Sequence, residues 1–209
     1  TSVAMIITAI ISPILGAIAD YSAGKKRFLL FFTLLCIAAT SSLFFLGSGD
    51  VFWGVAIFIL ANVGFEAGLV FYDSFLPEIT EPKNYGRVSG YGFAMGYLGS
   101  LATLAIIYPF IQAEMIKESF PVAALFFLIF SLPLFVYLKD NRKKIVEHES
   151  YFKIGVTRVW NTLLHLKNYK NLATFLLAYF FYIEGVNTII FFSGNYASTT
   201  LGFSETELL

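Results

Sequence analysis

The chain has 209 residues, of which 57% are hydrophobic and 13% charged, and its formal net charge at pH 7 is zero. Soluble domains carry about 25% charged residues, so a fold in water could not cover its surface with so few charges. The composition predicts a membrane protein, and the zero net charge gives no reason to expect a nucleic-acid partner.

Six apolar stretches are close to the length of about 20 residues that crosses a bilayer as a helix. They cover residues 3–19, 28–47, 51–72, 88–111, 120–138 and 172–192. The sequence therefore predicts an all-α, polytopic membrane bundle with six spans. Because the chain begins at Thr1 inside an apolar segment and ends at Leu209 beside apolar residues, we expect a fragment of a longer protein.

Lysine and arginine are sorted onto alternate connections between these spans. If the spans alternate in direction, only Lys117 lies on one side, and the other thirteen cations lie on the opposite side. The thirteen are Lys25, Lys26, Arg27, Lys83, Arg87, Lys139, Arg142, Lys143, Lys144, Lys153, Arg158, Lys167 and Lys170. Basic residues concentrate in cytoplasmic loops, so the sequence predicts that the cation-rich side is cytoplasmic.

The connection after the first span combines glycines, an acid and a run of cations. Its residues are Gly16, Asp20, Gly24, Lys25, Lys26 and Arg27. Gly16 would allow close helix approach, Gly24 would turn the chain, and negative charge on Asp20 would be favoured near another helix N-terminus. The pattern resembles the signature loop between the second and third helices of the major facilitator superfamily, which implies a gating role. An ordinary positively charged turn is the alternative.

The third span contains an acidic side chain at bilayer depth. Glu66 follows Asn62 by one turn and precedes Asp73 by two turns, so the three lie on roughly one helix face. A charge at the bilayer centre costs about 2.5–3.5 kcal/mol on insertion scales, so such groups face a bundle interior or a wet cavity. Glu66 is a candidate to bind a substrate ammonium group or a coupling proton, and a neutral structural role is the alternative. Asp73 is grouped with the signature loop as a gating candidate.

The fourth span carries small residues at spacings of three and four. They include Gly92, Gly96, Gly99 and Ser100. Small residues let membrane helices pack backbone to backbone. The stripe predicts either a sliding surface between mobile bundles or tight static packing, and the sequence leaves both open.

The long basic stretch 139–170 contains apolar residues at helical spacing. They are Tyr151, Phe152, Val156, Val159, Trp160, Leu163 and Leu164. This pattern is typical of an amphipathic helix at the cytoplasmic interface, with its cations toward water and anionic headgroups. A solvated charged loop is the alternative.

The sixth span carries a second acid at bilayer depth, Glu184, with Tyr182 before it and Asn187 after it. The same energetic cost applies, so Glu184 either lines a cavity or forms a structural hydrogen bond. The candidate pathway residues are therefore Asn62, Glu66, Tyr182, Glu184 and Asn187.

Residues for metal, thiol or hydrolytic chemistry are few and scattered. Cys36 is the only cysteine, so no disulfide or cysteine-based metal site can form within the chain. His148 and His165 have no companion ligands at metal-site spacing. We expect no metal site, no cofactor and no enzyme activity, and we leave proton coupling open.

Four segments resemble one particular transporter family. They are residues 71–79, 86–92, 96–99 and 175–189. They are similar to the vacuole-effluxer family, which contains autophagy-related fungal vacuolar amino-acid exporters and many bacterial relatives. The resemblance implies that the six spans are helices two to seven of a twelve-helix major-facilitator fold, in a bacterial inner membrane rather than a vacuolar one.

The resemblance also implies a domain division and a function. Residues 1–138 would form an N-terminal bundle, 139–170 a cytoplasmic linker, and 171–209 the first helix of a second bundle with its external loop. The function would be secondary active transport of amino acids or similar small solutes by alternating access. The partners would be membrane lipids, the solute and the missing helices of its own chain. A non-transporting scaffold or assembly subunit and a membrane-embedded enzyme are the alternatives.

Overall fold

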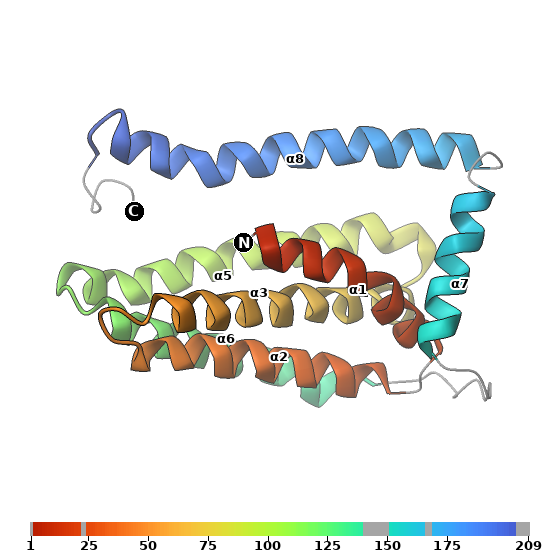
Figure 1. The fold of residues 1–209 in the computed structure, drawn as a ribbon. Helices are drawn as coiled ribbons and strands as arrows, with labels where there is room; N and C mark the ends of the chain where they lie inside the picture. The colour runs from red at the N-terminus through yellow and green to blue at the C-terminus, as the bar shows by residue number, and fades with distance from the viewer. Residues whose placement is uncertain (1, 22–23, 140–150, 166–168, 204–209) are drawn as a thin grey trace. The chain divides into compact units, whose positions relative to one another are not determined.

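The structure, a computed structural model, describes residues 2–21, 24–139, 151–165 and 169–203. These residues form helices joined by short connections, and no strand occurs among them (Figure 1). The helices are α1 (Ser2–Tyr21), α2 (Lys25–Ser42), η1 (Leu43–Phe45), α3 (Val51–Asp73), α4 (Leu76–Ile79), η2 (Pro82–Asn84), α5 (Tyr85–Gln112), α6 (Ile116–Tyr137), α7 (Tyr151–Leu164) and α8 (Lys170–Thr199). The predicted all-α fold is confirmed.

Six of these helices, α1, α2, α3, α5, α6 and α8, are long and apolar enough to cross a membrane. Each coincides with one predicted span, and most ends agree within a few residues. The exception is α8, which continues to Thr199, well beyond the predicted end at residue 192. The chain is a multi-pass integral membrane protein.

The second span begins earlier than predicted, directly after Gly24. The Gly24 carbonyl oxygen accepts hydrogen bonds from the backbone N–H groups of Arg27 and Phe28, at 2.9 and 3.3 Å. Lys25 and Lys26 therefore lie with Arg27 in the first turn of α2 rather than in a loop. The helix therefore fixes the directions in which these cations point.

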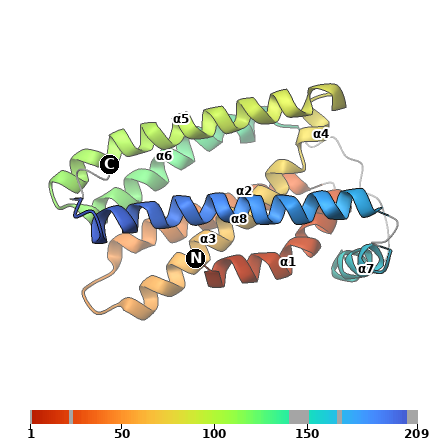
Figure 2. The same ribbon diagram turned by 90° about the horizontal axis from the view of Figure 1, so that it is seen from above.

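The chain divides into two compact units, Thr1–Thr157 and Arg158–Leu209, and the division falls inside α7. In the first unit α3 packs against α1 and α2, α6 packs against α2, and α5 packs against α6 (Figures 1 and 2). The second unit contains the end of α7 and α8. The domain boundary expected after residue 138 stays a prediction.

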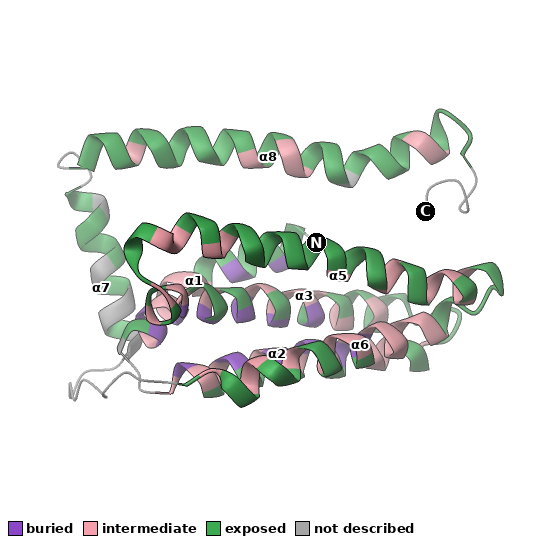
Figure 3. Ribbon diagram, turned by 180° about the vertical axis from the view of Figure 1, so that it is seen from behind, coloured by how far each residue is buried: buried purple, intermediate pink, exposed green. Residues whose placement is uncertain are grey.

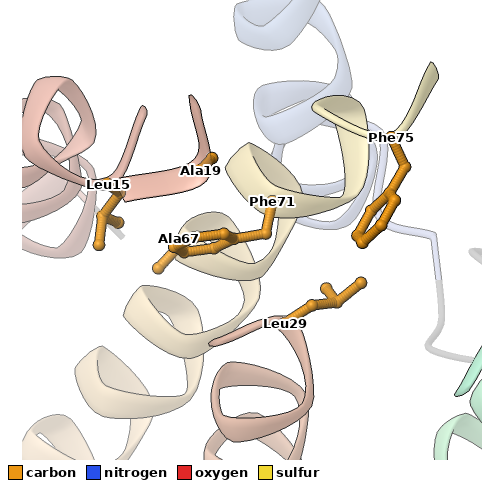
Figure 4. Close-up of a cluster of buried hydrophobic side chains, with 6 residues drawn as sticks. All are labelled: Leu15, Ala19, Leu29, Ala67, Phe71 and Phe75. Atoms are coloured by element: carbon orange, nitrogen blue, oxygen red, sulfur yellow. The ribbon is translucent and has the colours of Figure 1, made fainter. Parts of the chain in front are cut away.

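The core of the first unit forms where α1, α2 and the end of α3 meet. Figure 4 shows its buried side chains, Leu15, Ala19, Leu29, Ala67, Phe71 and Phe75. The Phe71 ring stacks on Phe28 and Phe32, with ring centroids 5.4 and 5.8 Å apart. Such aromatic pairs add about 0.5–1.5 kcal/mol each beyond the effect of area burial. This cluster joins three spans at one end of the unit.

Burial is uneven among the spans (Figure 3). Buried side chains occur along α1, α2 and α3, whereas among the described residues α5 has none and α6 has only Ala124. Lipid tails are as apolar as leucine, so an outward-facing apolar side chain carries no penalty in a membrane. The polar side chains that do lie within spans are therefore the informative ones.

Candidate functional site

The helix α3 has a packed face and a polar face. The packed face holds the buried residues Ala61, Gly64, Ala67, Gly68 and Phe71. At about 100° per residue, Asn62, Glu66 and Asp73 fall within about 40° of one another and on the opposite side of the helix. The continuous helix thus places these three residues on one face, away from its contacts with α1 and α2.

The three polar residues of this face differ in environment. Asn62 and Glu66 are half-buried, whereas Asp73 is exposed. Asn62 Nδ2 donates to the Phe58 carbonyl oxygen at 2.8 Å, so the amide turns back onto its own helix. Within the part of the chain that the structure describes, the Glu66 carboxylate forms no hydrogen bond or ion pair. The structure therefore aligns Asn62 and Glu66 without joining them.

Asn62 also lines a hollow of about 230 Å³ between α2, α3 and α6. The other lining residues are Cys36, Thr40, Leu43, Phe58, Ala61, Phe65 and Phe120. Most of these side chains are apolar, and Glu66 is not among them. The hollow therefore does not collect the predicted acidic residues.

Lys25 is fully buried where the first turn of α2 meets the segment after α3. Its Nζ donates to the Ser74 carbonyl oxygen at 2.9 Å and lies 2.5 Å from Glu78 Oε1. The ammonium also lies 4.1 Å from the centroid of the Phe75 ring. A carboxylate, a carbonyl oxygen and an aromatic face therefore replace the water that a charged amine loses on burial.

Glu78 is the member of this site that sequence reasoning missed. We grouped Asp73 with the signature loop, but the carboxylate beside Lys25 belongs to Glu78 in the short helix α4. A signal was present, because Pro77 directly before Glu78 is typical of the first turn of a helix, where an acid is favoured. The sequence alone did not show that this turn lies against the start of α2.

The other signature-loop residues lie around this contact. Lys26 Nζ donates to the Leu138 carbonyl oxygen at 2.6 Å, which ties α2 to the end of α6. A Cβ atom on Gly16 would meet nothing within 4 Å, so Gly16 makes no close helix contact with the described residues. Asp20 and Arg27 are exposed. The gating role of this group stays a prediction.

The small-residue stripe of α5 makes few close contacts with the other helices of its unit. A Cβ atom on Gly92 would lie 3.5 Å from Tyr72 Oη, and one on Gly96 or Gly99 would meet nothing within 4 Å. Ser100 Oγ donates to the Gly96 carbonyl oxygen at 3.1 Å, within the same helix. Both readings of the stripe, sliding and static packing, stay predictions.

Close backbone packing occurs instead on α3. A Cβ atom on Gly64 would lie 3.0 Å from the Cys36 backbone nitrogen and 3.2 Å from the Phe32 carbonyl oxygen. Gly64 and Gly68 are four residues apart, which is the spacing typical of helix association in membranes. This small-residue pair was visible in the sequence and was missed.

The remaining candidates, Tyr182, Glu184 and Asn187, lie on α8 in the second unit. Glu184 and Asn187 are about 60° apart around the helix axis, whereas Tyr182 lies about 160° from Glu184. Asn187 is half-buried, and the other two are exposed. The helix therefore groups Glu184 with Asn187 and separates Tyr182 from them.

The sequence model of the vacuole effluxer Atg22-like family matches residues 1–209, which is the whole chain. The chain belongs to this family. It is 34% identical over its whole length to the uncharacterized MFS-type transporter YxiO of Bacillus subtilis, and it covers 51% of that protein. No solved structure shows a significant match.

Two further relatives match most of this vacuole effluxer-like chain. It is 28% identical to an uncharacterized protein of Aquifex aeolicus, with 93% of this chain and 46% of that protein aligned. It is 24% identical to autophagy-related protein 22 of Kluyveromyces lactis, with 89% of this chain and 41% of that protein aligned. The chain thus spans about half the length of the curated relatives it matches. One relative is named as an MFS-type transporter, and the two bacterial relatives agree with a bacterial inner membrane.

Proposed function

We propose that the chain forms part of a secondary active transporter that moves a small solute, such as an amino acid, by alternating access. In such transporters two bundles rock about a central site near the membrane midplane. Membership of the vacuole effluxer Atg22-like family and the relative named as an MFS-type transporter support this proposal. Because the chain spans about half the length of its relatives, the activity is proposed for the complete protein.

One observation carries the proposal: the Glu66 carboxylate lies on the face of α3 that is turned away from α1 and α2. A charge held against lipid would cost about 2.5–3.5 kcal/mol, so this face needs water or a polar partner. A solute pathway supplies both. Glu66 would bind a solute ammonium group or a coupling proton there, and Asn62 would lie one turn away on the same face.

The helix α8 carries two further polar candidates of the pathway. Glu184 and Asn187 share a face of α8, so they are the two residues of that helix that could meet one solute together. Tyr182 points to the other side of the helix and is assigned no solute contact in this proposal. No resident cofactor is proposed, and the driving force would be the proton gradient.

The proposal is tested by transport in liposomes that contain the protein expressed from its complete reading frame. Uptake of a mixture of radiolabelled amino acids is measured across a range of pH, with Glu66→Gln compared with the parent. We expect uptake to fall by about tenfold or more and its pH dependence to flatten. The matched control is Glu81→Gln, which removes an exposed carboxylate outside α3 and should leave transport unchanged. An unaltered rate and pH profile in Glu66→Gln would reject the role of Glu66.

A non-transporting assembly subunit is the second candidate, and the open stripe of α5 favours it. Gly96 and Gly99 lie without close contacts in their unit, as they would on a surface that receives another helix. Glu66→Cys and Glu184→Cys separate the two functions through labelling with a water-soluble maleimide. A transporter exposes both positions to water in at least one state, whereas protection of both favours the assembly subunit.

A further inference from the structure

The helix α7 presents an exposed apolar face. Val156, Val159, Trp160 and Leu164 are all exposed, and Trp160 and Leu164 each keep 63% of their surface accessible. At about 100° per residue these four side chains fall within about 140° of one another, and Thr162 lies outside this sector, about 120° from Val156 and 160° from Trp160. An apolar face of this size requires a partner.

The length of α7 excludes a membrane span as the explanation. Its 14 residues extend about 21 Å at 1.5 Å per residue, which is short of the hydrocarbon thickness of about 30 Å. An amphipathic helix of this length lies in the plane of the interface instead. Asn161 and Thr162 lie outside the sector of the four apolar side chains and are exposed, which agrees with that orientation.

The chain also holds α7 near a membrane surface. The helix ends at Leu164, and the span α8 begins at Lys170. Six residue steps reach at most about 20 Å, so the end of α7 cannot move further than that from the end of the span. A lipid surface is therefore always within reach of the exposed face.

The charge of this connection indicates which lipid the helix would meet. Residues 139–170 contain eight lysines and arginines and only three acidic residues. The cytoplasmic leaflet carries anionic headgroups, which attract such basic segments close to the membrane. Trp160 adds a second indication, because tryptophan concentrates at the membrane–water interface.

We propose that α7 docks on the anionic lipid surface of the cytoplasmic leaflet. Val156, Val159 and Trp160 enter the boundary between headgroups and acyl chains, and the positive charge of the connection attracts the helix to anionic headgroups. This interaction goes beyond solute transport and does not depend on it. The occupant of the apolar face is the lipid, not a protein partner.

Fluorescence of Trp160 tests this docking directly. The protein expressed from its complete reading frame is reconstituted in nanodiscs with Trp160 as its only tryptophan, which within this chain requires Trp53→Phe. The nanodiscs contain phosphatidylcholine brominated near the glycerol end of the acyl chain, with or without phosphatidylglycerol. We expect strong quenching by the brominated lipid, an increase when phosphatidylglycerol is present, and weak quenching by aqueous iodide.

Two substitutions that each add one negative charge to α7 sharpen the test. Val156→Asp changes the apolar face, and Thr162→Asp changes an exposed position about 120° away from Val156 around the helix. We expect Val156→Asp to reduce quenching by the brominated lipid about twofold or more, and Thr162→Asp to leave it nearly unchanged. Equal effects of the two substitutions would overturn the proposal, because the added charge rather than the apolar face would then be responsible.

Three further outcomes would overturn the proposal without any variant on α7. Quenching by aqueous iodide and not by brominated lipid would place Trp160 in water. Protection from both quenchers would place it against protein. Lipid quenching that is the same with and without phosphatidylglycerol would remove the anionic specificity.

Discussion

Lys25 is a buried cation, and neighbouring groups compensate the charge of its ammonium group. The Glu78 carboxylate, 12% exposed, lies 2.5 Å from the Lys25 ammonium. Removal of one member of a buried ion pair costs about 3–5 kcal/mol, because the other charge stays largely buried without its counter-charge. Lys25→Met is therefore expected to lower the midpoint of thermal unfolding markedly in detergent solution. The midpoint is measured as the temperature at which half of the monodisperse protein is lost.

The exposed ion pair between Lys83 and Glu81 is the matched control for Lys25→Met. Its atoms are 2.7 Å apart, but both side chains are largely in solvent. Such pairs contribute about 0–1 kcal/mol, so Lys83→Met should hardly change the unfolding midpoint. The double variant Lys25→Met/Glu78→Leu should recover part of the lost stability. Similar midpoints for Lys25→Met and Lys83→Met would show that Glu78 does not stabilise the buried ammonium.

Glu114 is a non-glycine residue with a positive φ of 58°, in the connection between α5 and α6. The left-handed conformation costs an L-residue about 1–2 kcal/mol, whereas glycine loses about 0.5–1 kcal/mol of chain entropy on folding. Glu114→Gly should therefore raise the free energy of unfolding by about 0.5–1 kcal/mol, measured by thermal unfolding. Ala113→Gly, one residue earlier at φ −84°, gains no such relief and should destabilise the protein. A loss of stability in Glu114→Gly contradicts the argument.

At the residue scale, the sequence identified polar groups but not their partners. Glu66 stood out because a carboxylate within an apolar span has a calculable cost. Glu78 did not, because an acid in a polar connection is ordinary until the folded chain brings it 2.5 Å from Lys25. That contact joins residues from different helices, and no local pattern specifies it.

The packing of α2 on α3 depends on one glycine. A Cβ atom at position 64 would lie 3.0 Å from the backbone nitrogen of Cys36, so Gly64→Ala forces the two helices apart. Overpacking of this kind costs about 1–3 kcal/mol. We expect Gly64→Ala to lower the thermal unfolding midpoint clearly.

Gly96 on α5 provides the comparison for Gly64, because a Cβ atom there meets nothing within 4 Å. Gly96→Ala should change stability by no more than about 0.5 kcal/mol, as surface substitutions do. If the α5 stripe slides against another bundle in the complete protein, Gly96→Leu should slow transport while the unfolding midpoint stays the same. Equal destabilisation by Gly64→Ala and Gly96→Ala would show that α5 is packed as closely as α3.

At the element scale, the sequence predicted the spans well and their pairing poorly. Apolar length alone locates α1, α2, α3, α5 and α6 within a few residues, because the bilayer sets that length. Small residues recur on both α3 and α5, and their spacing does not show which helix has a close neighbour. Only the fold shows that Gly64 lies against α2.

The whole molecule combines an apolar exterior with a strongly uneven distribution of cations. If the six spans alternate in direction, as the sequence predicts, thirteen of the fourteen lysines and arginines lie on one side. The connection at Gly47–Asp50 then lies on the other side, where Asp50 Oδ2 accepts the Gly47 N–H at 2.8 Å and closes the turn. Composition predicted this membrane architecture, because a chain with so few charges has no other stable surroundings.

The side on which each connection lies can be measured in intact cells. Ser48→Cys and Glu81→Cys are made separately in a Cys36→Ala background, so that each variant has a single thiol in the chain. Because basic residues are retained in the cytoplasm, a membrane-impermeant maleimide should label position 48 in intact cells and position 81 only after the membrane is opened. Labelling of both positions from the same side would mean that the number of spans between them is even, whereas α3 is the one span predicted there. The alternation of α3 would then be wrong, and with it the assignment of Lys25, Glu78 and α7 to the cytoplasmic side.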